Sequence, residues 1–193
     1  MYKVFQKYMD AKIELSQEQS DWIRSLCVVK KLRKHKFLLQ EGDICRQHAF
    51  VTSGCLKSYS VDRDGMEHIV KFAVEHWWIA DRESLLSGEP AKLNIDAVED
   101  SEAVLISKKD FDLICQQIPA FNDMVNAILQ NAYNAAQNRN LANISLSACE
   151  KYEYFLQRYP DLALRIPQGM IASYLGISPE TLSRARNQVM SRK

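Results

Sequence analysis

The sequence predicts an α+β chain with a β-rich first half, one long helix and a helical C-terminal segment. Short strand-like segments separated by turns fill residues 27–106. A stretch without Gly or Pro follows, from about residue 120 to 144, and two short helical segments flank Gly176 near the end. These changes of period predict three parts, which are residues 1–118, 119–146 and 147–193.

The β-rich part has seven or eight short strands at regular spacing. The sequence "DRDG" (62–65) lies between two of them and indicates a hairpin, because Asp-Gly tolerates the positive φ of tight turns. Strands of this kind predict a double-stranded β-helix, also called a jelly roll. The tandem Trp77-Trp78 is expected to pack the core rather than line a ligand pocket. The predicted strands are 27–33, 36–40, 48–54, 55–61, 66–74, 93–98 and 103–107.

A short helix over 107–119 and a long helix after it are predicted next. In the long helix, apolar residues recur at spacings of four, three, four and three, which is typical of a helix that packs on another helix. Two interpretations stay open: the seam packs on its own β-domain, or it meets the parallel helix of a second subunit. The candidate dimerisation residues are Phe121, Val125, Ile128, Ala132 and Ala135.

A helix over 147–160 with Ser147 as its N-cap leads to a helix-turn-helix pattern. In a twenty-residue numbering from Gln168, Ala172 is fifth and Gly176 is ninth. The second helix crosses at the fifth position, which must be small, and the ninth needs a positive φ. Ser178 is a suitable N-cap and Pro179 suits the first turn of the next helix. Apolar residues fill the inner positions: Ile171, Leu175, Ile177, Leu182 and Ala185.

The second helix of this motif places its N-terminal residues on base edges in the DNA major groove. Arg184 can donate two hydrogen bonds to guanine, and Glu180 can accept one from a cytosine amino group. Residues 160–193 have five basic and two acidic side chains, a local balance of +3. A two-helix corner with a purely structural role is the alternative. The candidate DNA-binding residues are Ser178, Pro179, Glu180, Thr181, Ser183, Arg184 and Arg186.

The composition is that of an ordinary globular protein, with 47% hydrophobic and 25% charged residues. The net charge of +1 neither favours nor excludes nucleic acid, because one basic face can hide in a neutral average. No apolar run is long enough to span a membrane, and "MYKVFQKYMD" has charges where a signal peptide needs apolar residues. We expect a cytoplasmic protein without a membrane partner.

Neither a metal site nor an enzyme is predicted. The cysteines show no C-x-x-C spacing and indicate buried free thiols, and the pair Cys45 and His48 is weak evidence for a metal. Asp81 and Glu83 are neighbouring carboxylates, but no nucleophile, metal cluster or phosphate loop accompanies them. The five cysteines are Cys27, Cys45, Cys55, Cys115 and Cys149.

Nearly the whole chain resembles the Crp–Fnr superfamily of bacterial transcription regulators. The stretch "LLQEGDICRQHAFVTSGCLKSYSVDRDGMEHIV" looks like the first glycine turn through the central hairpin of the cyclic-nucleotide-binding-type β-roll. "WWIADRESLLSGEPAKLNIDAVEDSEAVLIS" resembles the phosphate-binding cassette and the strands after it. "IPQGMIASYLGISPETLSRAR" is similar to the DNA-reading unit. The resemblance implies a homodimer with a long dimerisation helix, bound to two-fold-symmetric double-stranded DNA, with RNA polymerase as a further partner.

Within this resemblance, Glu180 and Arg184 fall on positions where relatives read bases. Pro179 falls where some relatives have a basic base-reading residue, so we expect a different preferred DNA site. Relatives usually add a β-hairpin wing after the recognition helix, but here only "NQVMSRK" follows Arg186. The wing is therefore expected to be missing or vestigial, with weaker nonspecific DNA affinity.

The cassette departs from that of the cyclic-nucleotide binders, which have Gly-Glu and then an Arg followed by Ser or Thr. Here the first pair is Ala80-Asp81 and the later position reads "PAKLN" (90–94). Lys92 would supply a charge without the bidentate fork of arginine, and a buried phosphate without a matched cation is costly. We expect no cyclic nucleotide and no cofactor, and any effector would be another small molecule. The candidate effector-pocket residues are Asp81, Glu83, Lys92 and Asn94.

Other sensor types of the superfamily are not favoured by the sequence. No cysteine precedes Cys27, which removes the usual iron–sulfur cluster, and a lone His68 or His76 is weak evidence for haem. Two hypotheses on function are left. The first is a homodimeric transcription regulator, and the second is a small-molecule-sensing or partner-binding module whose DNA-reading unit has decayed.

Overall fold

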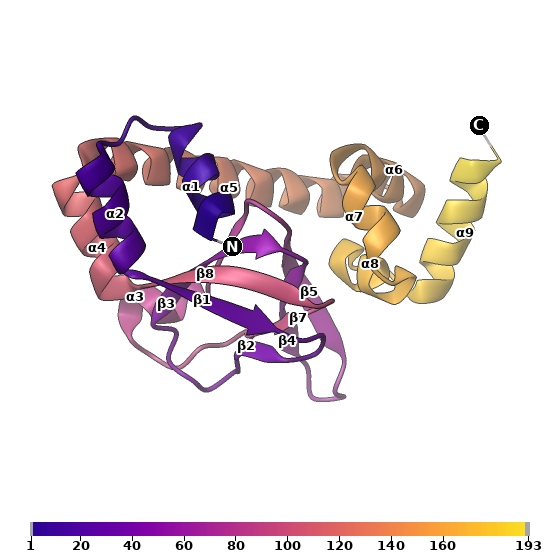
Figure 1. Ribbon diagram of the computed structural model, residues 1–193. Coiled ribbons are helices and arrows are strands. Elements are labelled where there is room, and N and C mark those ends of the chain that lie inside the picture. The colour runs from indigo at the N-terminus through magenta and orange to yellow at the C-terminus, as the bar shows by residue number, and fades with distance from the viewer. Residues whose placement is uncertain (1, 192–193) are drawn as a thin grey trace. The chain divides into compact units, whose positions relative to one another are not determined.

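The computed structural model describes residues 2–191, and within them the chain forms nine helices and eight strands (Figure 1). Two compact units are present: residues up to Ser60 with Val70–Ile128, and Val61–Ile69 with the residues from Leu129 onward. The helices are α1 (Tyr2–Asp10), α2 (Gln17–Ser25), α3 (Arg82–Ser87), α4 (Lys108–Gln117), α5 (Pro119–Ser145), α6 (Ala148–Arg158), α7 (Pro160–Arg165), α8 (Gln168–Leu175) and α9 (Pro179–Met190).

Two four-stranded sheets make a β-sandwich. Their strands are β1 (Cys27–Leu32), β2 (Phe37–Leu39), β3 (Gln47–Ser53), β4 (Leu56–Val61), β5 (Glu67–Ala73), β6 (Trp78–Ile79), β7 (Asn94–Ala97) and β8 (Ser101–Ser107). One sheet has the order β1-β8-β3-β6 and the other β2-β7-β4-β5. Most strands that follow one another along the chain lie in different sheets. Such crossing between two sheets is typical of a jelly roll. The predicted architecture is confirmed.

The core between the two sheets is apolar and almost completely shielded from solvent. Val51 of one sheet and Leu56 and Ile95 of the other are at most 1% exposed. Strand alternation produces this core, because residues two apart point to the same face of a sheet. Each such side chain contributes about 1.5–3 kcal/mol on burial, so this core is a main source of stability of the first unit.

Helices cover the outer face of the β1-β8-β3-β6 sheet. Phe5 of α1 and Ile23 of α2 pack with Phe50 and Ile106 of the sheet, and residues of α4 and of the start of α5 join the same cluster. Figure 1 shows α1, α2 and α4 on the side of β1 and β8. Neither α1 nor α2 was predicted from the sequence, although Ser16 begins α2 with a capping box.

Two turns of the sandwich depend on glycine. Gly65 has φ of 80° in the predicted hairpin turn, where Asp62 Oδ1 accepts a hydrogen bond from the amide of Met66 at 2.9 Å. Gly54 has φ of 90°, and a Cβ there would lie 2.7 Å from the carbonyl oxygen of Asp100. A side chain at position 54 would therefore displace the backbone before β8.

The helical part of the second unit has a small core of its own, formed by α6 to α9. Phe155 and Ile171 are at most 1% exposed, and Leu162 and Val189 are 4% and 3% exposed. Helix α6 begins as predicted at Ser147, whose hydroxyl and the carboxylate of Glu150 form a capping box. Helix α7 was not predicted: Pro160 occupies its first turn, because proline lacks only an amide hydrogen that this position leaves unbonded.

Most predicted elements are present, and the remaining expectations have mixed outcomes. All seven predicted strands are confirmed, whereas β6, α1, α2, α3 and α7 were missed. Trp78 packs edge-on against Phe5, Phe50 and Phe111, as expected for a core residue, but Trp77 is 37% exposed. All five cysteines are free, and two of them, Cys45 and Cys55, are buried.

Two kinds of feature are absent from residues 2–191, a group of metal ligands and a membrane-spanning helix. Between residues 2 and 191, no three His, Cys, Asp or Glu side chains are grouped to hold a metal ion. In the same part of the chain, no helix combines the length and the apolar character that a membrane span requires.

Candidate nucleic-acid interface

Helices α8 and α9 form a corner around a few tightly buried side chains. Ile171 and Ala172 of α8 are at most 1% exposed, and Leu182 and Ala185 of α9 are each 2% exposed. Ala172 lies where the motif requires a small residue, because the second helix packs against this point. The helix-turn-helix geometry that the spacing predicts is therefore present.

The turn between the two helices is a left-handed glycine cap. Gly176 has φ of 64° and ψ of 36°. Its amide donates to the carbonyl oxygen of Ser173, and the amide of Ile177 donates to that of Ala172, both at 3.1 Å. These bonds satisfy carbonyl groups at the end of α8, and glycine adopts the conformation without a Cβ penalty.

Helix α9 starts at Ser178, as predicted. The Ser178 hydroxyl accepts a hydrogen bond from the Thr181 amide at 3.2 Å, and Pro179 occupies the first turn. The amide groups that the cap does not satisfy give the helix N-terminus a partial positive charge. Such an end of a helix binds anions, including phosphate groups.

The predicted DNA-binding residues share the solvent side of α9. Hydrogen bonds from its own backbone amide and from the Ser178 hydroxyl, with a smaller effect of the Arg184 charge, lower the pKa of Glu180. Glu180 and Arg184 are four residues apart, so they lie one turn apart on the same face. Thr181 is half-buried and the other six are exposed: Ser178, Pro179, Glu180, Ser183, Arg184 and Arg186.

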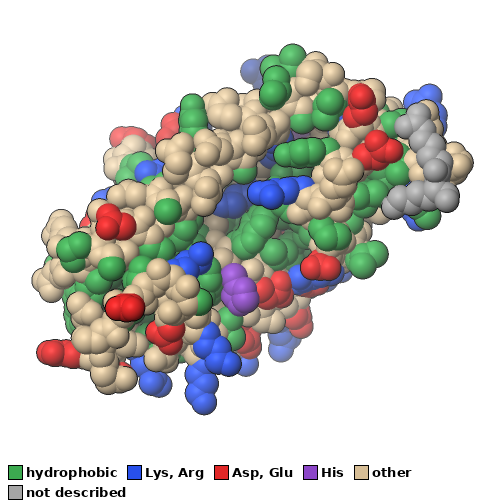
Figure 2. Space-filling view, turned by 90° about the horizontal axis from the view of Figure 1, so that it is seen from above, with side chains coloured by type: hydrophobic (Ala, Val, Ile, Leu, Met, Phe, Trp, Pro, Cys, Tyr) green, Lys and Arg blue, Asp and Glu red, His purple; other side chains and the backbone are tan. Residues whose placement is uncertain are grey.

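Charged side chains of both signs are spread over the protein surface. In Figure 2, blue Lys and Arg side chains alternate with red Asp and Glu side chains over the visible face. This agrees with the net charge of +1. The visible face therefore shows charges of both signs rather than a broad positive field.

Ser173 and Arg139 hold helix α8 in contacts that the sequence analysis missed. Ser173 Oγ donates to the Glu67 carbonyl oxygen at 2.6 Å and accepts from the Ile69 amide at 3.0 Å. Arg139 Nη2 donates to the Ile69 carbonyl oxygen at 3.3 Å, and the guanidinium lies 4.3 Å from the centre of the Tyr174 ring. All five residues belong to the second unit. No periodic pattern could have revealed these hydrogen bonds, which join residues 70 to 106 positions apart in the chain.

The seam predicted along α5 divides into two parts. Phe121 is fully buried in the cluster under the β1-β8-β3-β6 sheet, and Val125 and Ile128 pack against the same cluster. At these positions the seam packs on its own β-domain, which was the alternative interpretation, so Phe121 has no surface left for a second chain. Ala132 and Ala135 are exposed, and their part in a dimer stays a prediction.

Asp81, the first candidate effector residue, has a structural role in the first unit. It is 4% exposed and caps α3, because its Oδ1 accepts a hydrogen bond from the Ser84 amide at 3.1 Å. Its Oδ2 accepts a second one from the Lys92 amide at 3.2 Å. Both carboxylate oxygens thus hold the segment between α3 and β7 in place.

The other three candidates are also engaged within the cassette segment. Glu83 and Lys92 form an exposed ion pair, in which Glu83 raises the pKa of Lys92. Asn94 Oδ1 accepts a hydrogen bond from the Glu41 amide at 2.9 Å. The four candidates lie near one another along the chain, and none of them lines either of the two cavities described below.

A cavity of about 270 Å³ does lie in the β-sandwich, and Ala80 and Ile95, the chain neighbours of Asp81 and Asn94, are among its lining residues. Its walls are mainly apolar, and none of Asp81, Glu83, Lys92 and Asn94 is among the described residues that line it. The volume is just below the usual range for small-molecule sites, about 300–1,000 Å³. The lining residues are Leu38, Leu39, Ile44, Cys45, Arg46, Gln47, Ala49, Ile79, Ala80, Ile95 and Leu105.

Comparison with known proteins agrees with this architecture. The family model of the cyclic nucleotide-binding domain matches residues 29–118. The regulatory protein HlyX of Actinobacillus pleuropneumoniae is 27% identical over 172 residues, which cover 80% of this chain and 68% of that protein.

Solved structures show the same fold. FixK2 from Bradyrhizobium japonicum superposes with a TM-score of 0.76 at 21% identity, over 86% of this chain and 85% of that one. A structure from Eubacterium rectale, named as a regulator of the crp/fnr family, gives 0.72 at 15% identity over 96% and 88% of the two chains. The chain, with a β-roll, a long helix and a helix-turn-helix in this order, is therefore similar to transcriptional regulators of the Crp–Fnr superfamily, and its residues 29–118 match the cyclic nucleotide-binding domain family.

Proposed function

We propose that this protein is a homodimeric transcriptional regulator in which α9 of each subunit enters one major-groove half-site of two-fold-symmetric DNA. The observation that carries the proposal is the exposed N-terminal face of α9, held in place by the buried residues of the corner. The protein acts in the cytoplasm, and RNA polymerase is the partner on which the bound dimer acts.

Each polar group on this face has a distinct part in the proposed DNA complex. Arg184 donates two hydrogen bonds to a guanine, and Glu180, whose pKa is lowered, stays ionised and accepts from a cytosine amino group. Ser178 and the N-terminus of α9 bind backbone phosphates, which fixes the position of the helix without reading sequence.

The dimer contact lies on the exposed part of α5. Ala132 and Ala135 allow close approach of a second helix, as the sequence predicts. Three large apolar side chains on the same part of α5 are also exposed: Tyr133 at 59%, Leu141 at 63% and Ile144 at 85%. Ala132→Glu tests the contact through the small residues, and Ile144→Glu tests the contact through the large apolar side chains. Only the substitution in the actual dimer contact should yield monomers, which sedimentation measures.

A second function is kept because of one observation: a cavity of about 270 Å³, large enough for a small ligand, lies in the β-sandwich. The chain would then be a small-molecule-sensing or partner-binding module whose DNA-reading unit has decayed.

Selection of binding sites from a random pool of DNA duplexes decides between these two functions. The purified protein is tested alone and with a metabolite extract. Enrichment of a two-fold-symmetric site establishes a dimeric DNA reader, and its dependence on the extract reveals an effector. A pool that stays random under both conditions contradicts DNA reading and favours the second function.

Arg184→Ala tests the assignment of the recognition helix. We expect loss of preference for one base pair in each half-site, worth about 1–3 kcal/mol, because the bidentate contact to guanine disappears. Selection with Arg63→Ala, which removes an exposed arginine from the hairpin turn, is the matched control and should enrich the wild-type site. An Arg184→Ala protein that selects the wild-type site unchanged would contradict the assignment.

A further inference from the structure

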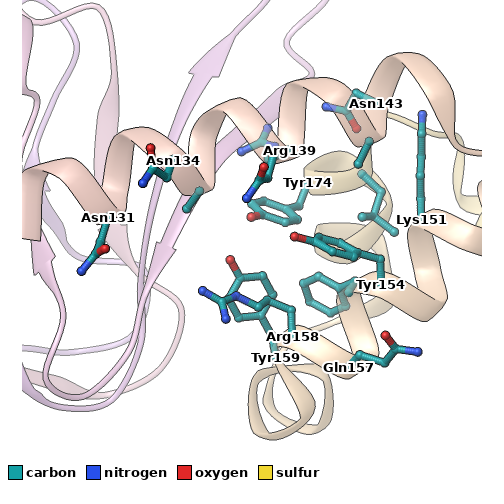
Figure 3. A pocket seen from close by; sticks show the side chains of 15 residues that line it. Asn131, Asn134, Arg139, Asn143, Lys151, Tyr154, Gln157, Arg158, Tyr159 and Tyr174 are labelled. Carbon is teal, nitrogen blue, oxygen red and sulfur yellow. The ribbon is translucent and has the colours of Figure 1, made fainter.

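A second, larger cavity lies within the helical part of the second unit. It has a volume of about 650 Å³ and is lined by residues of α5, α6 and α8 (Figure 3). This volume is in the middle of the usual range for small-molecule sites, about 300–1,000 Å³. Neither the family match over residues 29–118 nor the predicted DNA-binding residues include any part of this pocket.

Basic side chains line this pocket without any acidic one. Arg139, Lys151 and Arg158 are among the described lining residues, and no Asp or Glu is. Lys151 and Arg158 are seven residues apart on α6, which is two turns, so they share one face. Within residues 2–191, neither of these two side chains makes an ion pair. The pocket therefore has positive charge that a bound anion would neutralise.

Aromatic rings form the wall beside these cations. Phe155 lies 5.6 Å from Tyr159 and 5.7 Å from Tyr174 between ring centres, and Arg139 stacks on Tyr174. Figure 3 shows Tyr154 of α6, Tyr174 of α8 and Tyr159, which follows the end of α6, pointing toward the pocket. Tyr154 is 41% exposed, so its ring has surface available for a ligand. Burial raises the pKa of Tyr174, which keeps its phenol protonated.

The long helix supplies neutral polar groups opposite the rings. Asn131, Asn134 and Asn138 are spaced by three and four residues, so they lie along one face of α5 that lines the pocket. Their amides can donate and accept hydrogen bonds without adding charge. Cations for an anionic group, rings for stacking and amides for orientation thus meet in one concave site.

We propose that this pocket binds a small anion that bears an aromatic ring, with its carboxylate or phosphate held by Arg158, its charge also attracted by Lys151, and its ring packed beside Tyr154. Duplex DNA fits this chemistry less well, because its bases are stacked inside the helix and offer no free ring to the tyrosines. Tyr174 and Leu175 belong to α8, so the ligand would touch the first helix of the helix-turn-helix. The site does not depend on the proposed DNA-binding function.

Calorimetric titration of the full chain with four probes tests the proposal. Two probes have both a ring and a charge, 2-naphthoate and 1-naphthyl phosphate, and they separate a carboxylate from a phosphate preference. Two controls have only one of the features: 2-naphthalenemethanol has the ring and inorganic phosphate has the charge. We expect one ligand per chain and at least one charged aromatic probe that binds about tenfold more tightly than either control.

Single substitutions locate the site. Lys151→Gln and Arg158→Gln should each weaken the charged aromatic probe about tenfold while leaving 2-naphthalenemethanol unchanged. Tyr154→Ala should weaken both. Lys109→Gln removes an exposed lysine from α4 and is the charge-matched control, with wild-type affinity expected. Circular dichroism checks that each variant keeps its helical content.

Three results would overturn the proposal. The first is no binding of either charged aromatic probe to the folded wild-type protein. The second is an equal loss of affinity in Lys109→Gln and Arg158→Gln, which would indicate nonspecific charge attraction. The third is a dimer, measured by sedimentation, that dissociates on Arg158→Gln, because the pocket would then be a contact between two copies of the chain. None of these measurements uses DNA, so failure of the proposed function would leave them unaffected.

Discussion

The two units differ in what the polar atoms of their candidate residues do. In the first unit, Asp81 and Asn94 accept hydrogen bonds from backbone amides and hold the cassette segment. In the second, Arg184 and Arg186 extend into solvent from a helix whose opposite side is buried. Polar side chains at the candidate sites thus hold the fold in one unit and face solvent in the other.

The two cavities differ in the same way. The cavity of the β-sandwich is small and mainly apolar, whereas that of the helical part is larger and combines cations with aromatic rings. The cavity in the part matched by the cyclic nucleotide-binding family model has Arg46 as the one charged side chain among its described lining residues. Three basic side chains and several aromatic rings line the pocket of the second unit instead, next to α8.

The largest expected effect is a loss of stability of the first unit at low pH, caused by His48. His48 stacks on Phe111 with 3.8 Å between ring centres, and burial lowers the pKa of His48 from 6.5 to about 4. Between these two pH values the unfolded chain binds the proton and the folded chain does not, so stability falls as the pH falls from 6.5 to 4. The full loss is about 3 kcal/mol, and it is absent above pH 6.5.

His48→Phe should remove this loss, because phenylalanine keeps the stacked ring and takes up no proton. Urea unfolding at pH 7 and pH 4 measures the free energy of unfolding of both proteins. We expect a smaller decrease in the variant, by about 3 kcal/mol. Parallel decreases in the two proteins would show that another group causes the acid sensitivity.

A smaller effect is expected at Asp81, where fold and function can be separated. Asp81→Ala should lower the free energy of unfolding by about 2 kcal/mol, because α3 loses its cap and the Lys92 amide loses its acceptor. Asp81→Asn keeps an oxygen for the cap and should cost less. Urea unfolding measures both variants. If Asp81→Asn has wild-type stability but responds differently to a metabolite extract, Asp81 acts on an effector. The contrast between the two units would then disappear.

The strands and the helix-turn-helix corner of α8 and α9 were predicted well because both depend on the spacing of nearby residues. Ala172, Gly176 and Ser178 each answer a geometric demand that is visible within a few residues. The pocket of the second unit could not be predicted in this way. Tyr174 and Arg158 line one pocket although they belong to different helices, and the helix-turn-helix pattern that contains Tyr174 indicates DNA binding rather than a small-molecule site.

The hydrogen bonds of Asp81 could not be predicted for a related reason. A carboxylate in a cassette-like segment suggests a ligand contact, but whether its oxygens face a ligand or an amide depends on the path of the chain. Here the amides of Ser84 and Lys92 occupy both oxygens. Phe121 shows the same limit, because its place in an apolar seam does not reveal which surface the seam meets.

The smallest expected effect tests whether one residue of the second unit serves both the fold and DNA. Ser178 caps α9 and is also proposed to bind a phosphate. Ser178→Ala should lower the free energy of unfolding by about 1 kcal/mol and weaken DNA binding. Ser178→Asp keeps the cap but repels the phosphate, so its thermal stability should match the wild type while DNA binding weakens. Ser178→Thr should preserve both properties. If Ser178→Asp binds the selected DNA as the wild type does, Ser178 acts only as a cap, and its exposed hydroxyl then resembles the occupied polar atoms of the first unit.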